Sequence, residues 1–226
     1  MEIERLQYIA TLIGEPARIQ ILWALMDGRA YTATELSVIA DVSPQSASMH
    51  LSKLVQADLL KVTPQGRHRY YSFAKDDVAY VVESMANLIP QDKIITSKKI
   101  KDIPFRYCRS CYNHLAGKVG VGITDNLLRL DFLTEKDHTY EVTASGHIFF
   151  HELGIDTTKL SGNKRSIARP CLDWSERRPH LAGSVGTALL TKMVDDQWVR
   201  RVHHSRTFIV TSIGKQNLYD KLGLAL

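Results

Sequence analysis

The sequence predicts a mainly α-helical protein with small β-hairpins, of the α+β class. Two observations support this prediction. Apolar residues recur at helical spacing through most of the first ninety residues, with one hairpin pattern among them. Beyond residue 105, two similar segments follow one another, and each combines helical and hairpin patterns. We therefore expect domains at 1–92 and 105–226, joined by a polar, lysine-rich linker at 93–104.

Composition excludes several protein classes. Of the 226 residues, 44% are hydrophobic and 23% are charged, which is an ordinary globular balance. No apolar run approaches the roughly 20 residues that span a membrane, and the acidic N-terminus does not resemble a secretory signal. Three cysteines are too few for a disulfide framework. We expect a cytoplasmic protein with no membrane partner.

The first four helices are predicted by their apolar stripes and by their starting residues. A helix is expected at 4–13, and Pro16 suits the first turn of a second helix that ends near Gly28. Thr32 and Glu35 have the spacing of a capping box, which predicts a third helix. Ser43 and the proline after it predict the start of a fourth helix over 44–56. Two short helices joined by a tight turn, the second amphipathic, form a helix-turn-helix.

The exposed face of the 44–56 helix, with its N-cap, is the first candidate binding site. It offers small hydroxyls, an amide, a methionine and a lysine, which permit close approach to a major groove and bond base edges or phosphates. A plain solvated face is the alternative for this helix taken alone. The candidate residues are Ser43, Gln45, Ser46, Ser48, Met49, Ser52 and Lys53.

A hairpin is predicted directly after this helix, with strands at 59–63 and 67–73 and a turn at 64–66. Arg67, His68 and Arg69 lie at its tip, where they can grip phosphate or enter the minor groove. They form the dense basic spot of a domain that is otherwise acidic, with eight Lys and Arg against eleven Asp and Glu in residues 1–92. A hairpin in this place is a wing, so residues 1–92 predict a winged helix-turn-helix domain.

A last N-terminal helix is expected at 76–89, with a nearly unbroken apolar stripe. We interpret this helix and the first one as the contact between two copies of the chain. Packing of the 76–89 helix onto the C-terminal half is the alternative.

The order of these motifs resembles the ArsR family of winged-helix regulators. The resemblance lies in Gly14-Glu15-Pro16-Ala17-Arg18, Thr34-Glu35-Leu36, the run from Val42 to Leu54, and Gly66-Arg67-His68-Arg69-Tyr70-Tyr71. It implies a homodimer that reads a pseudo-palindromic operator in double-stranded DNA, usually as a repressor released by a small signal. Metal-sensing members carry cysteines before the turn or histidines on the last helix. Residues 35–39 hold no cysteine and residues 76–88 hold no histidine, so neither of those metal sites is supported.

The C-terminal part contains an internal repeat, at about 108–156 and 174–226. A His-Leu-Ala-Gly-x-x-Gly motif occurs at 114–120 and again 66 residues later, at 180–186. Each copy reads as helix, strand, turn, strand, helix, an order also found in the second half of a winged helix. We predict two winged-helix-like repeats that pack as a pseudo-symmetric pair around a cleft, and we interpret the glycines as packing residues.

The three cysteines allow several interpretations. Cys108, Cys111 and His114 are spaced three apart, so on a helix they would share one face, and Cys171 could complete four ligands for zinc or another soft metal. They could also be buried structural residues. A thiol switch is a third interpretation, with neighbouring arginines lowering a thiol pKa. In the second copy Trp174 and Arg177 align with the two cysteines of the first, which weakens the metal interpretation, and no cofactor is predicted with certainty.

Together these features predict a DNA-binding transcription regulator, a dimeric repressor that senses a small-molecule, redox or metal effector through residues 105–226. We expect no enzymatic activity. An enzyme with a cysteine nucleophile fused to a DNA-binding domain is one alternative, but the sequence contains no phosphate loop and no nucleophile elbow. A protein-interaction module that has lost DNA binding is the other.

Overall fold

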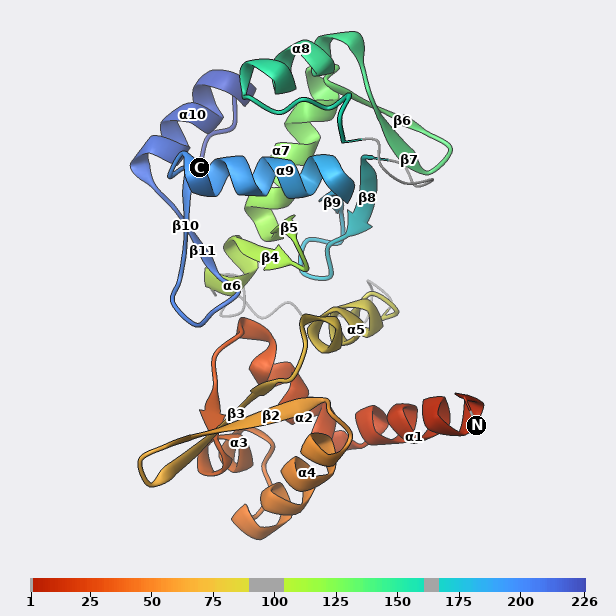
Figure 1. The fold of residues 1–226 in the computed structure, drawn as a ribbon, viewed down its shortest axis with the longest axis vertical. Helices are drawn as coiled ribbons and strands as arrows, with labels where there is room; N and C mark the ends of the chain where they lie inside the picture. Colours follow the sequence, from red (N-terminus) through yellow and green to blue (C-terminus); the bar gives the residue numbers. More distant parts are fainter. Residues whose placement is uncertain (1, 90–103, 161–166) are drawn as a thin grey trace. The chain divides into compact units, whose positions relative to one another are not determined.

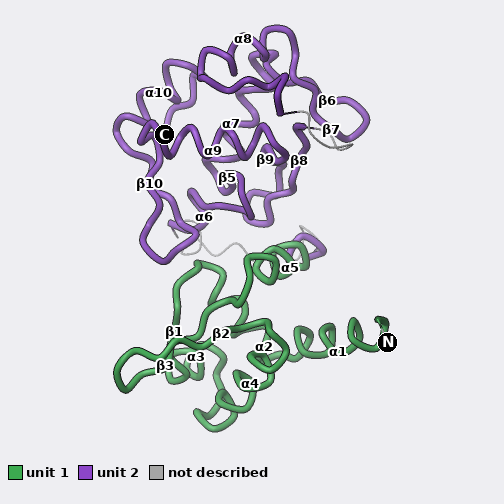
Figure 2. The backbone as a smooth tube through the Cα atoms, viewed as in Figure 1, with its two compact units in different colours: residues 1–85 green, residues 86–226 purple. Residues whose placement is uncertain are grey.

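The structure, a computed structural model, describes residues 2–89, 104–160 and 167–226. The chain divides into two compact units, 1–85 and 86–226 (Figure 2). The linker predicted at 93–104 lies, except for its last residue, outside the described residues. Within the described ranges no single helix is long and apolar enough to cross a membrane. The first two helices pass that test of length and composition only as a pair bent by 78°.

The N-terminal unit is a helical domain with one small antiparallel sheet (Figure 1). Leu22, Leu36 and Leu51 are fully buried in its core. The three strands stand in the order β1-β3-β2. Its elements are α1 (Glu2–Gly14), α2 (Pro16–Ala24), a 3-10 turn (Leu25–Asp27), β1 (Tyr31–Thr32), α3 (Ala33–Ile39), α4 (Pro44–Gln56), β2 (Leu60–Gln65), β3 (His68–Phe73) and α5 (Asp76–Ala86).

The Gly-Glu-Pro-Ala-Arg motif forms the corner between α1 and α2. The Arg18 guanidinium is buried and donates hydrogen bonds to the main-chain carbonyls of Leu12 and Thr11, which are otherwise unpaired at the end of α1. Glu15 is the N-cap of α2, and its carboxylate accepts a bond of 2.9 Å from the main-chain N–H of Arg18. The motif therefore fixes the direction in which α1 leaves the domain.

The C-terminal unit presents one order of elements twice: hairpin, helix, hairpin, helix (Figure 1). A one-turn helix, α6 (Pro104–Tyr107), precedes the first half. That half contains β4 (Arg109–Cys111), β5 (His114–Ala116), α7 (Gly117–Arg129), β6 (Leu133–Lys136), β7 (Thr139–Val142) and α8 (Ala144–Glu152). The second contains β8 (Arg169–Leu172), β9 (Pro179–Ala182), α9 (Gly183–Asp195), β10 (Val199–Arg201), β11 (Phe208–Val210) and α10 (Ser212–Leu222).

Residues 109–116 form the β4–β5 hairpin, so Cys108, Cys111 and His114 do not share one face of a helix, the arrangement in which their spacing would bring all three together. The backbone groups of this segment pair across the hairpin and with a distant segment: Ser110 N–H donates to the carbonyl of Arg206, and Phe208 N–H donates to that of Cys108. Tyr112 turns the chain with a φ of 56°. A spacing of three therefore places Cys111 opposite His114 across two strands, and not above it on a helix.

The glycines of the repeated motif are packing residues, as the sequence predicted. A Cβ atom at Gly120 would lie 2.5 Å from the carbonyl oxygen of Leu115, and one at Gly186 would lie 2.4 Å from that of Leu181. Both positions also face the other half, since Gly186 lies against the Cβ of His114. Without side chains at these two positions, α7 and α9 can start tightly against their own hairpins.

Candidate functional site

Helix α4 is anchored by one face and exposes the other. Ser43 is its N-cap, and the Ser43 hydroxyl accepts a hydrogen bond of 3.2 Å from the main-chain N–H of Ser46. Ala47, Leu51 and Leu54 have no exposed surface, which fixes the helix on the core. The opposite face is exposed and consists of Gln45, Ser48, Met49, Ser52 and Lys53, while Ser46 is half-buried.

Two contacts fix the helices around this face. The predicted capping box of α3 is confirmed: Thr32 and Glu35 each bond the other's backbone N–H. On α4, the Nδ1 of His50 lies 3.4 Å from the Glu15 carboxylate. Burial alone would raise the pKa of Glu15, but hydrogen bonds from backbone N–H groups at the start of α2 hold it below its usual value. The contact between His50 and Glu15 thus holds α4 against the start of α2.

The β2–β3 hairpin is the predicted wing, but its turn lies further along the chain. Pro64 pairs with Arg69 inside the ladder and Gln65 pairs with His68, so the turn consists of Gly66 and Arg67 instead of residues 64–66. Gly66 has a φ of 59°, a conformation that suits glycine. Arg67, His68 and Arg69 are all exposed at the tip, so this end of the wing is basic.

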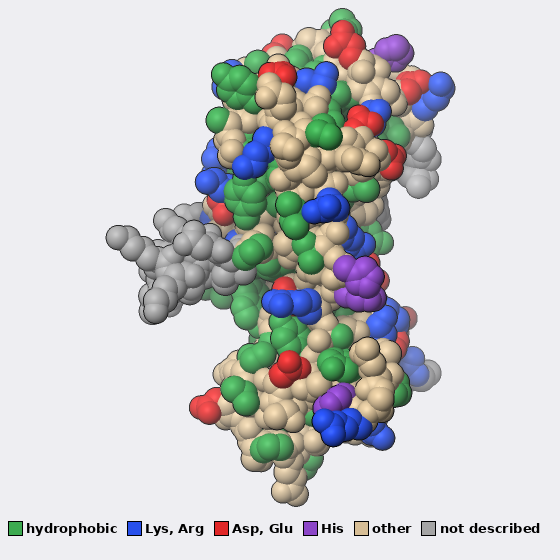
Figure 3. Space-filling view, turned by 90° about the vertical axis from the view of Figure 1, so that its left-hand side faces the viewer, with side chains coloured by type: hydrophobic (Ala, Val, Ile, Leu, Met, Phe, Trp, Pro, Cys, Tyr) green, Lys and Arg blue, Asp and Glu red, His purple; other side chains and the backbone are tan. Residues whose placement is uncertain are grey.

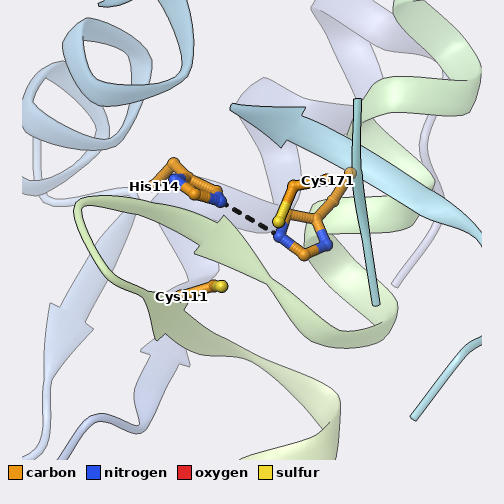
Figure 4. Close-up of side chains that lie close together, drawn as sticks. Cys111, His114 and Cys171 are labelled. Carbon is orange, nitrogen blue, oxygen red and sulfur yellow. Dashed lines mark hydrogen bonds between the residues drawn. The ribbon is translucent and has the colours of Figure 1, made fainter. Parts of the chain in front are cut away.

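Four side chains from the two hairpins of the C-terminal unit converge in its interior (Figure 4). They are Cys111 and His114 of the β4–β5 hairpin, and Cys171 and His180 of the β8–β9 hairpin. One nitrogen or sulfur atom from each lies within 4.8 Å of the other three. The Nε2 atoms of the two histidines are 3.1 Å apart, the contact drawn dashed from His114 in Figure 4. All are buried except Cys171, which is half-buried.

Cys108 lies outside this cluster. It follows α6, is fully buried, and its burial raises its pKa to about 12, which outweighs the lowering effect of Arg109. The structure thus brings together three of the four predicted Cys and His residues and adds His180. The activation of a thiol by neighbouring arginines does not apply to Cys108.

A buried ion pair supports the cluster. The Asp173 carboxylate accepts hydrogen bonds from Arg109, at 3.0 Å, and from the backbone N–H of Gly117, at 2.7 Å. The same oxygen lies 3.4 Å from Nδ1 of His180. Burial would raise the pKa of Asp173, but His180 and Arg109 hold it well below its usual range. Burial would lower the pKa of His180, but Asp173 and Cys111 outweigh it and raise that pKa.

The cleft expected between the two repeats is small. A cavity of about 230 Å³, including its open mouth, lies between α7 and α9, and it is lined by Leu115, Gly120, Ile123, Leu181, Gly186, Leu189 and Leu190. Sites for drug-sized ligands usually measure about 300–1,000 Å³. The space falls below that range, and its lining offers no charged group.

Basic side chains of the C-terminal unit do not gather into one patch on the face drawn in Figure 3. They are interspersed there with acidic side chains.

Comparison with known proteins shows which family the chain belongs to. Residues 13–63 match the model of a helix-turn-helix domain family. The chain is 43% identical over 210 residues to the uncharacterised HTH-type transcriptional regulator YdfF of Bacillus subtilis, and the match covers 92% of each protein. The chain belongs to the family of HTH-type transcriptional regulators. Within this DNA-binding regulator, the matched residues lie in the winged helix-turn-helix domain that the order of the motifs predicted.

Solved structures match a smaller part of this regulator. NolR from Sinorhizobium fredii is 24% identical. The match covers 38% of this chain and 86% of the NolR chain, with a TM-score of 0.36. PagR, a transcriptional repressor of Bacillus anthracis, is 25% identical. The match covers 38% of this chain and 97% of PagR, with a TM-score of 0.34. Likenesses at such TM-scores do not bear on the function of this chain.

Sequence reasoning missed His180 as a member of the regulator's buried cluster, and it missed Asp173 as the carboxylate beside it. The repeat contained the signal for His180, because it aligns with His114. The second hairpin is longer, however: Cys171 precedes His180 by nine positions, whereas Cys111 precedes His114 by three. An alignment with a fixed offset therefore set Arg177, and not Cys171, against Cys111.

Proposed function

We propose that this regulator is a dimeric repressor that reads a pseudo-palindromic operator with α4 and the β2–β3 wing. A single observation carries the proposal: a polar, exposed helix face and a basic hairpin tip lie on one packed scaffold. Helix α4 has the size and chemistry to enter the major groove, while the wing tip suits phosphate or the minor groove. No catalytic step is part of this function.

Within α4, the side chains have different tasks. Gln45 and Met49 are exposed and long enough to reach base edges, and Gln45 has the amide that pairs well with adenine. The Ser43 hydroxyl already caps the helix, and Ser48 donates to the carbonyl of Pro44 at 2.9 Å. Both serines retain acceptor capacity, which suits contacts at close approach. Lys53 is a phosphate contact.

The dimer supplies the two-fold symmetry that such an operator needs. On α1, only Leu12 and Ile13 are buried, whereas Ile3, Leu6 and Tyr8 are 61%, 63% and 52% exposed. A contiguous exposed apolar surface of this kind marks an interaction site. In our proposal a second copy covers α1, and the exposed Val81 and Met85 of α5 contribute to the same contact.

The C-terminal unit is proposed to have arisen by duplication of a winged-helix-like element and to receive the signal that releases the operator. The twofold order of hairpins and helices supports the duplication. The effector itself, whether a small molecule, a redox change or a metal, acts on this unit in the proposal and not on the DNA-binding domain.

The test compares operator binding by the full chain and by the double variant Arg67→Ala/Arg69→Ala. DNA fragments selected by the wild-type protein serve as the operator. We expect weaker binding and a shallower dependence of log affinity on log salt, by about 0.9 for each phosphate that the variant no longer neutralises. The matched control is Lys215→Ala/Lys221→Ala on α10, which removes the same charge from two exposed positions of the other unit. Equal affinities for both variants would show that the wing tip does not touch DNA.

A further inference from the structure

We propose that Cys111, His114, Cys171 and His180 form a tetrahedral Cys2His2 zinc site that joins the two halves of the C-terminal unit. The four residues come from two hairpins far apart in sequence, and each hairpin supplies one cysteine and one histidine. This inference is independent of the proposed DNA contacts, because all four residues lie within 86–226.

The distances fit a small metal ion. Zinc binds imidazole nitrogen at about 2.0–2.1 Å, so two such ligands of a tetrahedral ion stand roughly 3.3 Å apart. The two Nε2 atoms are 3.1 Å apart. The whole set of ligand atoms lies within 4.8 Å, so binding requires only small movements of side chains.

The two imidazole rings are oriented as metal ligands are. Each ring turns Nε2 toward the other ring, and each has an oxygen near its Nδ1. For His180 this oxygen is a carboxylate oxygen of Asp173, at 3.4 Å, and for His114 it is the amide oxygen of Asn113, at 3.3 Å. Metal-bound histidines are commonly held by such an oxygen partner on the second nitrogen, which fixes the tautomer and the ring direction. Asp173 is itself held by Arg109 and by the backbone N–H of Gly117.

The two halves of the site correspond to each other in the internal repeat. Cys111 stands directly opposite His114 in one antiparallel ladder, and Cys171 stands directly opposite His180 in the other. Gly186 lets the second half approach the Cβ of His114, and Gly120 lies near that of His180. A metal ion bound by both pairs therefore ties one half to the other.

The four ligand atoms, two sulfurs and two imidazole nitrogens, indicate which metal the site binds. Two thiolates and two imidazoles are soft and borderline ligands, which favour zinc over magnesium or calcium. Four protein ligands leave no open position, so the site is of the closed type that stabilises a fold and does not perform catalysis. None of the four residues lies in the DNA-binding domain.

The experiment uses the full chain, stripped with a chelator under reducing conditions and then titrated with Zn²⁺ or with Co²⁺ as a spectroscopic probe. We expect one metal ion per chain by elemental analysis. With Co²⁺ we expect the visible absorption of a tetrahedral ion and a thiolate-to-cobalt charge-transfer band. Zinc should also raise the unfolding temperature, because it binds only the folded arrangement.

Variants then assign the ligands. Cys111→Ser and Cys171→Ser should each weaken the charge-transfer band and lower affinity by more than the roughly 10–100-fold expected for loss of an oxygen partner of a ligand. Cys108→Ala is the matched control: it removes the third cysteine, which is buried outside the cluster, and should retain one metal ion per chain.

Four results would overturn the proposal. One is wild-type protein that binds no metal at equimolar Zn²⁺. Another is a cobalt spectrum without the thiolate band, a measurement on wild-type protein that does not depend on whether the variants fold. The third is equal loss of metal in Cys108→Ala and Cys111→Ser. A Cys111–Cys171 disulfide in freshly purified, metal-free protein would identify these two residues as a redox pair instead.

Discussion

At the scale of single residues, the C-terminal unit depends on positions where no side chain fits. Gly186 lies 2.4 Å, measured from where a Cβ would stand, from the carbonyl oxygen of Leu181, and it faces His114 of the other half. Such a contact is with backbone, so it cannot be relieved by turning a flexible side chain. The small residues of the repeated motif thus set the distance between the halves.

We therefore predict that Gly186→Ala lowers the free energy of unfolding by about 1–3 kcal/mol, the usual cost of overpacking. Denaturant unfolding, followed by the fluorescence of the buried Trp198 in the same unit, measures this. Gly14→Ala is the control, since a Cβ there meets nothing within 4 Å. The packing argument fails if the two variants are equally stable.

A second prediction at this scale concerns the buried ion pair of Arg109 and Asp173. Asp173→Asn removes the carboxylate that pairs with the buried Arg109 guanidinium, and breaking one side of such a pair typically costs about 3–5 kcal/mol. Chemical denaturation of the full chain should show this loss. The double variant Arg109→Met/Asp173→Asn removes both charges. Its loss of unfolding free energy should therefore be clearly smaller than the sum of the losses in Arg109→Met and in Asp173→Asn. Strict additivity would mean that the pair does not act as a unit.

At the scale of elements, the sequence predicted the features that depend on contacts between residues close together in the chain. The capping box at Thr32 and the Ser43-Pro44 start of α4 were found because a cap is a contact between residues three apart. The spacing of three between Cys108, Cys111 and His114 could not distinguish a shared helix face from a tight hairpin, because it fits both. The strands of the β4–β5 hairpin are held partly by Arg206 and Phe208, about a hundred residues away, which periodicity does not reveal. The wing was predicted, but its turn was misplaced because Pro64 is accommodated within the ladder.

The position of that turn yields a prediction for the wing. Gly66 has a φ of 59°, which asparagine tolerates and a β-branched residue does not. Gly66→Val should displace Arg67 and Arg69 and weaken operator binding, with little change in unfolding temperature because the tip is exposed. Gly66→Asn should bind nearly as wild type does. Operator titrations of both variants at one salt concentration distinguish the two effects, and equal binding by both would show that the shape of the tip does not matter.

At the scale of the whole molecule, the proposed dimer links α1 to DNA binding. A pseudo-palindromic operator offers two half-sites, and a monomer can hold only one of them. Leu6 is 63% exposed on a helix that leaves the domain at the Arg18 corner, so a charge there should not disturb the core. It would, however, be buried without a counter-charge in a dimer that uses this face.

We predict that Leu6→Glu converts the protein to a monomer and sharply weakens binding to a full operator, while its affinity for an isolated half-site stays close to that of the wild type. Sedimentation equilibrium gives the mass, and titration of full and half operators gives the affinities. Ile148→Glu on α8 is the control, because Ile148 is equally exposed, at 63%, but lies in the other unit. If Leu6→Glu remains a dimer, α1 is not the contact, and the exposed apolar residues of α5 become the next surface to test. If Leu6→Glu is monomeric but still binds the full operator tightly, each chain reads its half-site alone, and the dimer serves another purpose than DNA recognition.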